Sequence, residues 1–209
     1  MASCVLGLPN PLVESREKGI FRSFKINGVP STSILAIPSL TAVFHALICS
    51  AIIAFTATPF FDAVPPQNWP MFILLTLLSA LAFGGLGALI GVVSSSARAV
   101  VLWSQLIFLP SMLLGGLMMP LSILPPSVQR VAAILPSSHA MQAMEGLAYG
   151  REVLYDPFIS VTILAAGTIL SFALAIFLFS WDDTNNTRRG HPALALLAIL
   201  PYLAAAIFL

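Results

Sequence analysis

A chain of 209 residues with 58% hydrophobic and only 8% charged side chains is not an ordinary water-soluble domain, because such domains carry about 25% charged residues. Its net charge of +1 gives no basis for binding nucleic acid, which requires a basic surface. The mean hydropathy of +0.98 indicates apolar runs, and several are long enough to cross a bilayer core of about 30 Å. We therefore expect an all-α, polytopic bundle of membrane helices.

Residues 1–30 contain the most charged stretch of the sequence and are expected to form a cytoplasmic segment. Charged and apolar residues alternate between Glu14 and Ile26, which predicts a short amphipathic helix at the membrane surface. This helix is either a docking surface for a cytoplasmic partner or a basic anchor that orients the chain. Its glutamates favour docking, because acidic residues contribute little to orientation. No cleaved signal peptide is expected, since no basic residue precedes the first apolar run.

Four uncharged apolar runs are predicted to span the membrane, at about 31–57, 71–93, 99–119 and 158–180. The second run contains Gly84, Gly87 and Gly91. The four-residue spacing of Gly87 and Gly91 predicts a face on which another helix approaches closely. Ordinary dense packing is the alternative for any one glycine.

His45 lies in the middle of the first predicted span. An ionisable residue at this depth indicates either a proton relay or a hydrogen bond to a neighbouring helix. The hydrogen bond is favoured, because the same span contains no acidic residue. The scarcity of charged residues in all four spans also argues against an ion-coupled carrier.

The third span is interrupted where an uninterrupted helix would satisfy every backbone group in lipid. It breaks at Gly115 and Gly116 and again at Pro120, and it continues through Pro125 into a short amphipathic turn that Pro136 ends. A simple anchor needs no such break. We therefore expect residues 120–157 to form a re-entrant or external connection that acts as a pathway, gate or docking surface.

The C-terminal part, 182–209, is expected to be a polar cytoplasmic hinge followed by an apolar run, 193–209, at the short limit for spanning. If four spans alternate, seven of the nine basic residues lie on the side of the N-terminus, the Arg98 turn and the hinge. Only Arg130 and Arg151 lie on the other side. Because basic residues accumulate in cytoplasmic loops, the N-terminus is predicted to be cytoplasmic.

No catalytic constellation is present: the sequence has no HExxH, no GxSxG and no phosphate-binding loop. His139 with Glu145, and His191 with Asp182 and Asp183, lack the spacing of metal ligands. Cys4 and Cys49 are not expected to form a disulfide. We therefore expect neither catalysis nor a metal site on this chain, and energy for transport would have to come from another protein.

Two motifs resemble the permease subunit of type-2 ATP-binding-cassette transporters, the exporter class. The first is REKG at 16–19 followed by IFRSFKINGVP, which is similar to the acidic-Arg-Glu-x-Gly coupling helix of that family, with Ser15 where an acid is common. The second, at 109–150, resembles the family pattern of a span ending in a small residue and Gly, a Met pair, Pro and an amphipathic turn. Family members usually have six spans, and this chain is expected to lack the first two.

The resemblance implies a permease that moves an amphipathic, drug-like or lipid-like solute out of the cell, as in multidrug efflux. It implies a plasma or inner membrane location in contact with lipid, a second permease copy, and a cytoplasmic partner ATPase that carries ATP and Mg, with no cofactor on this chain. The implied coupling residues are Glu14, Arg16, Glu17, Lys18, Gly19 and Arg22. The implied external gate residues are Gly115, Gly116, Pro120, Pro125 and Pro136. The alternative is a non-transporting membrane protein, either a truncated or an assembly subunit of a permease complex.

Overall fold

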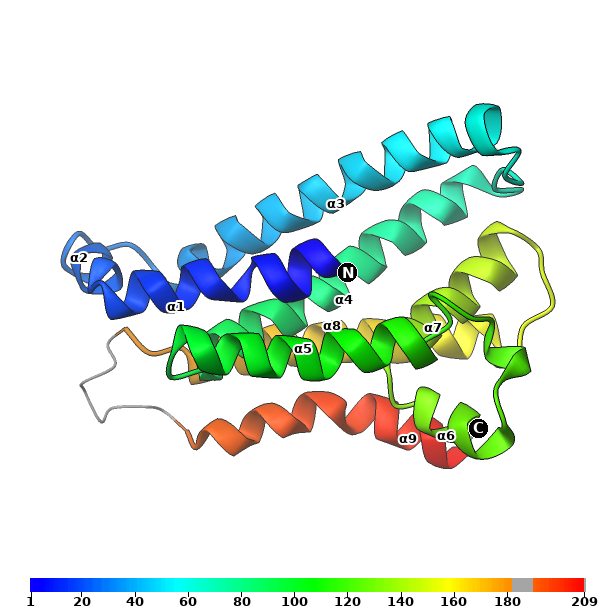
Figure 1. Cartoon of the computed structure of the whole chain (residues 1–209). Helices are drawn as coiled ribbons and strands as arrows, with labels where there is room; N and C mark the ends of the chain where they lie inside the picture. The colour runs from blue at the N-terminus through cyan, green and yellow to red at the C-terminus, as the bar shows by residue number, and fades with distance from the viewer. Residues whose placement is uncertain (182–189, 209) are drawn as a thin grey trace.

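In the computed structural model, which describes residues 1–181 and 190–208, every regular element of the described chain is helical. Four of the described helices are long and apolar enough to cross a membrane: α3 (Ser31–Phe61), α4 (Trp69–Val93), α5 (Ala97–Leu114) and α8 (Pro157–Leu178). They lie lengthwise beside one another in a bundle (Figure 1). The predicted all-α polytopic bundle is therefore confirmed. Most of the predicted hinge, at 182–189, lies outside the described residues.

Polar side chains at the helix starts define where three of these helices begin. The side chain of Asn68 accepts a hydrogen bond from the Met71 amide at 3.1 Å, and that of Ser96 accepts one from the Ala99 amide at 3.3 Å. Asp156 accepts one from the Phe158 amide at 2.8 Å. Each cap satisfies an amide that has no partner inside its own helix. The caps therefore fix the starts of α4, α5 and α8.

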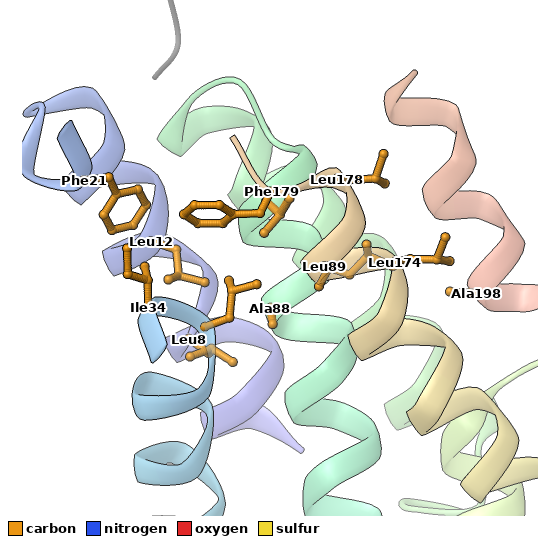
Figure 2. Packing of buried hydrophobic residues seen from close by; sticks show 13 residues of the cluster. Leu8, Leu12, Phe21, Ile34, Ala88, Leu89, Leu174, Leu178, Phe179 and Ala198 are labelled. Atoms are coloured by element: carbon orange, nitrogen blue, oxygen red, sulfur yellow. The ribbon is translucent and has the colours of Figure 1, made fainter. Parts of the chain in front are cut away.

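The centre of the bundle is formed by α4 and α8, while α3 lies at the periphery. In the most apolar part of α4, 61% of the residues are buried, against 39% in α8 and 6% in α3. One buried cluster joins both central helices to α3 and to the N-terminal and C-terminal segments. Figure 2 labels ten of its members: Leu8, Leu12, Phe21, Ile34, Ala88, Leu89, Leu174, Leu178, Phe179 and Ala198.

The N-terminal region, for which one short amphipathic helix was expected, contains three helical elements. A π-helical turn, η1 (Ser3–Gly7), continues into α1 (Pro9–Glu17), and both lie against α4. The buried residues Cys4, Leu8 and Leu12 recur every four positions, so they form one apolar face. Pro9 does not interrupt the segment, because proline is tolerated in the first turn of a helix. A separate short helix, α2 (Ile20–Ile26), follows α1.

After α5 the chain folds back through short elements. These are η2 (Leu121–Ile123), α6 (Pro126–Ala132), α7 (Pro136–Ala143) and the π-helical turn η3 (Met144–Ala148). The preceding helix ends at Leu114 rather than at 119, because Gly115 caps it and Gly116 has a left-handed φ of 82°. Most of α7 is buried, and it lies against α4, α5 and α8. The C-terminal elements η4 (Pro192–Ile199) and α9 (Leu200–Phe208) run along α8.

Candidate functional site

Five of the six predicted coupling residues lie around the corner between α1 and α2. Gly19, with a φ of 71°, makes this corner, since a left-handed conformation costs glycine little. Glu14, Glu17, Lys18 and Arg22 are exposed around it. Glu14 and Lys18 form a surface ion pair of 3.2 Å, a kind of contact that contributes little to stability. These exposed side chains form a mixed-charge surface that another protein could contact.

Arg16 is separated from the other coupling residues, because its side chain points into the bundle and is only 4% exposed. Its Nη1 donates a hydrogen bond to the Val92 carbonyl at 2.9 Å, and its Nη2 donates one to the Ser94 carbonyl. Carbonyls at the end of a helix have no partner in that helix and carry partial negative charge. The Arg16 guanidinium therefore joins the end of α1 to the turn between α4 and α5.

The short helix α2 is attached to the bundle through Phe21. The Phe21 ring lies against that of Phe179, just after α8, with 5.6 Å between the ring centroids (Figure 2). Phe24 is 40% exposed and Ile26 is 80% exposed. Lys25 lies between them and is also exposed. The outer side of α2 therefore combines apolar and basic side chains, while Phe21 links the helix to α8.

The glycines of α4 differ in how closely other helices approach them. A Cβ on Gly87 would collide with the Cys4 carbonyl, and one on Gly91 would lie 2.9 Å from Cδ1 of Leu12. The predicted glycine face therefore receives the N-terminal helix. Gly84 has more room, since a Cβ there would lie 3.6 Å from its nearest neighbour.

Of the five predicted gate residues, two are buried, two are exposed, and Gly116 is partly buried. Gly115 is buried against Ser137, and a Cβ on Gly115 would collide with the Ser137 hydroxyl. Pro136 begins α7 beside this contact and is also buried. Pro120 and Pro125 are exposed at the turns on either side of η2. The end of α5 and the start of α7 are thus in direct contact.

Two glutamines that the sequence analysis missed hold the connection between α5 and α8 together. Gln129 Nε2 donates to the Leu124 carbonyl at 2.9 Å and to the Leu121 carbonyl at 3.2 Å. Gln142 Oε1 accepts from the amides of Leu154 at 2.6 Å and Tyr155 at 3.1 Å. An amide side chain within an otherwise apolar stretch was the available signal, because such groups form hydrogen bonds between elements.

Tyr155 completes this network from the loop before α8. Its hydroxyl donates to the Gln129 carbonyl at 2.8 Å. Burial raises the pKa of the Tyr155 hydroxyl, so the group remains a protonated donor at neutral pH. The loop that precedes α8 is therefore bonded to both α6 and α7.

His139 and His45 occupy contrasting positions. His139 is fully buried in α7, with Nε2 2.8 Å from the Ala133 carbonyl. His45 is exposed on the outer surface of α3. Among the residues that the structure describes, no three His, Cys, Asp or Glu side chains gather into a potential metal site. The histidines therefore do not share a site.

A cavity of about 340 Å³ lies between α3, α4 and the α7–η3 region. Its lining includes Ser50 and Ala54 of α3, Phe72 of α4, Met141 of α7 and Tyr149. The described residues that line it include no charged side chain. Its volume and composition are within the range of sites that bind small apolar molecules.

Comparison with known proteins assigns the chain to a family. A model of the ABC-2 family transporter proteins matches residues 1–177. The chain is also similar to "Putative transport permease YvfS" of Bacillus subtilis (strain 168), with 29% identity over 140 residues. That alignment covers 66% of this chain and 57% of the relative, so the chain spans little more than half the relative's length. No solved structure matches the chain. The chain belongs to the ABC-2 family, as a multi-pass membrane protein of the transport permease type.

Proposed function

We propose that this chain is the membrane subunit of an ATP-driven exporter, and that a separate cytoplasmic ATPase binds ATP and Mg and docks on α2. The observation that carries the proposal is the form of α2. This short helix exposes Phe24, Lys25 and Ile26. It follows the corner at Gly19, and Phe21 links it to the end of α8. A helix that exposes apolar residues next to basic ones is suited to a protein groove.

Two contacts would transmit a displacement of α2 into the bundle. The first is the Arg16 guanidinium, which is bonded to the end of α4, and the second is the Phe21 ring, which lies against Phe179. Both α4 and α8 are central and both contact α7. The displacement of α2 that accompanies ATPase docking would thereby be transmitted through rigid helices to the buried contact between Gly115 and Ser137. In this proposal α2 is cytoplasmic and residues 115–156 form the external gate.

The proposed solute is amphipathic, either drug-like or lipid-like, and leaves the cell through a pathway shared with a second permease copy. Helices α3, α4 and α8, which contain no Asp, Glu, Lys or Arg, support this proposal, as does the cavity of about 340 Å³, whose described lining includes no charged side chain. A charged solute would lack compensating groups there, and burying an uncompensated charge is costly. The proposed location is the cell membrane, where lipid covers the exposed apolar surface of α3.

The docking proposal is tested by co-expressing the chain with an ATP-binding-cassette ATPase from the same organism and purifying the complex from membranes. We expect Glu17→Lys and Phe24→Glu to reduce the recovered ATPase at least about tenfold, equivalent to about 1.4 kcal/mol of binding free energy. Arg151→Glu, an exposed change on the loop before α8, is the matched control and should leave recovery unchanged. Recovery that is equal for all three variants would disprove docking on α2.

Export itself is tested separately, by efflux of an uncharged lipophilic fluorescent dye from cells that express the complex. ATP-dependent efflux that Phe24→Glu abolishes supports the permease proposal. A complex that binds the ATPase normally and moves neither this probe nor a fluorescent lipid would instead favour the non-transporting assembly subunit.

A further inference from the structure

The C-terminal segment lies beyond the residues that the family model matches, which end at 177. Its elements η4 and α9 nevertheless pack along α8 (Figure 1). Ala198, Tyr202 and Ala205 are at most 5% exposed, and they follow one another at four and three positions, as one helical face requires. Leu196, Leu203 and Ile207 are exposed on the other side. The segment therefore has a specific inner face.

Tyr202 is the largest side chain on that inner face and is 1% exposed. Its hydroxyl end lies directly on Gly167 of α8, where a Cβ would overlap it. Its ring lies beside the buried His139 ring of α7, with 5.9 Å between the ring centroids. One side chain thus contacts both a central helix and the folded-back connection.

The end of α9 makes a second contact with the same connection. Ala206 packs against a buried cluster that includes Leu121, Ala132, Ala133 and Tyr155. Ala206 also lines, with Arg130 and Ala133, a cavity of about 190 Å³. Figure 1 shows the end of α9 beside α6. The C-terminal segment therefore contacts α6 through Ala206 and α7 through Tyr202.

We propose that residues 190–208 form an intramolecular strap that holds residues 126–143, the hairpin formed by α6 and α7, against α8, with Tyr202 as the positioning residue. The hairpin needs such support because its helices have only 7 and 8 residues, and helices of this length are unstable without tertiary packing. This inference concerns the position of the hairpin and stands whether or not the chain exports a solute.

The Tyr202 ring, rather than its hydroxyl, makes the contact with α7. Within the described residues, neither the Tyr202 hydroxyl nor Nδ1 of His139 has a hydrogen-bond partner. Ring packing is therefore what joins α9 to α7, and stacked or tilted aromatic pairs are favourable beyond the area that they bury. Tyr202→Phe should keep the strap in place, whereas Tyr202→Ala should release it.

The test measures the reaction of a cysteine under the strap with a water-soluble methanethiosulfonate reagent in membrane vesicles. The cysteine is Ala133→Cys, at a position 1% exposed beside Ala206, in a Cys49→Ser background that keeps the buried Cys4. We expect Tyr202→Ala to raise its labelling rate at least about tenfold, since labelling of a buried group follows the population of the open form. Tyr202→Phe should leave the rate unchanged.

A matched control reports on general loosening of the bundle. Ser94→Cys places the cysteine beside Arg16, at a position that is 2% exposed and directly follows the C-terminal end of α4. Its labelling should not change in Tyr202→Ala. An equal rise at positions 94 and 133 would show general destabilisation and would overturn the strap.

A second variant displaces the strap from the α8 side and leaves its own sequence intact. Gly167→Ala puts a methyl group where the Tyr202 hydroxyl lies, so it should also raise labelling at position 133 alone. This variant decides the question if Tyr202→Ala fails to insert. Labelling at 133 that stays at the wild-type rate in Gly167→Ala, or that rises in Tyr202→Phe as much as in Tyr202→Ala, would overturn the proposal.

Discussion

Arg16 at the end of α1 donates a hydrogen bond from Nη1 to the carbonyl of Val92 at the end of α4, 2.9 Å away. The same guanidinium also donates to the Ser94 carbonyl. A planar guanidinium can serve two acceptors with fixed geometry, which a glutamine amide with a shorter stem cannot match. This one side chain connects α1, which leads into the helix α2 proposed to meet the ATPase, with the central helix α4.

Arg16→Gln is expected to lower the free energy of unfolding by about 1–3 kcal/mol, because it leaves buried carbonyls without donors. Unfolding of the detergent-solubilised chain by SDS titration measures the change. Arg98→Gln, which alters an exposed arginine, should stay within about 0.5 kcal/mol of wild type. Equal stability of Arg16→Gln and Arg98→Gln would contradict the role assigned to the buried guanidinium.

Gly87→Val is expected to separate the N-terminal helix from α4, because its side chain would occupy the place of the Cys4 carbonyl. Overpacking of this kind costs about 1–3 kcal/mol. Gly84→Ala is the control, since its Cβ would have no neighbour nearer than 3.6 Å. The same SDS titration measures the free energy of unfolding of both variants. An equally large loss of that free energy in Gly84→Ala would show that α4 tolerates no side chain at either position.

Gly116→Leu is expected to impair export while membrane insertion and ATPase recovery remain normal. Gly116 has a φ of 82°, and a branched side chain in this conformation strains the turn between α5 and η2 by about 1–2 kcal/mol. Gly116→Asn should be milder, because asparagine adopts left-handed conformations more readily. The efflux assay ranks the variants, and normal export by Gly116→Leu would count against a gate at this turn.

Gln142→Met is expected to loosen the loop before α8, because the amides of Leu154 and Tyr155 lose their shared acceptor. The side chains have similar size, so the main effect is the unmet hydrogen bonds, at about 1–3 kcal/mol for the buried Tyr155 amide and less for the part-buried Leu154 amide. Hydrogen exchange of these two amides, followed by mass spectrometry, should become faster. Gln105→Met, at an exposed position of α5, is the control and should leave exchange of the Leu154 and Tyr155 amides unchanged.

Long apolar runs made the helical bundle predictable, because chain length and composition alone determine what can cross a membrane. The run predicted at 71–93 corresponds closely to α4, whose start is fixed by Asn68. The burial of one face of residues 3–17 could not be predicted in this way. Pro9, Asn10 and Pro11 obscure the four-residue periodicity of Cys4, Leu8 and Leu12, and the surface that buries them belongs to α4.

The break of the third span at Gly115 was predictable, because it follows from local glycine and proline chemistry. The left-handed turn at Gly19 was not predicted, since one amphipathic helix was expected between Glu14 and Ile26. The inward direction of Arg16 depends instead on carbonyls far along the chain, so a charged residue that looked like part of a docking surface proved to be buried. Gln129 and Gln142 were missed for a similar reason, since their partners come from loops whose paths the sequence does not determine locally.

The bond between Arg16 and the end of α4 also constrains the order of biosynthesis. The acceptor carbonyls of Val92 and Ser94 follow Arg16 by 76 and 78 residues, so they leave the ribosome long after it. Until then, placing the guanidinium in lipid would carry the cost of an uncompensated charge. Residues 3–17 should therefore wait at the aqueous surface until the α3–α4 hairpin has been inserted, and nascent chains stalled before Val92 should keep a cysteine at position 4 reactive.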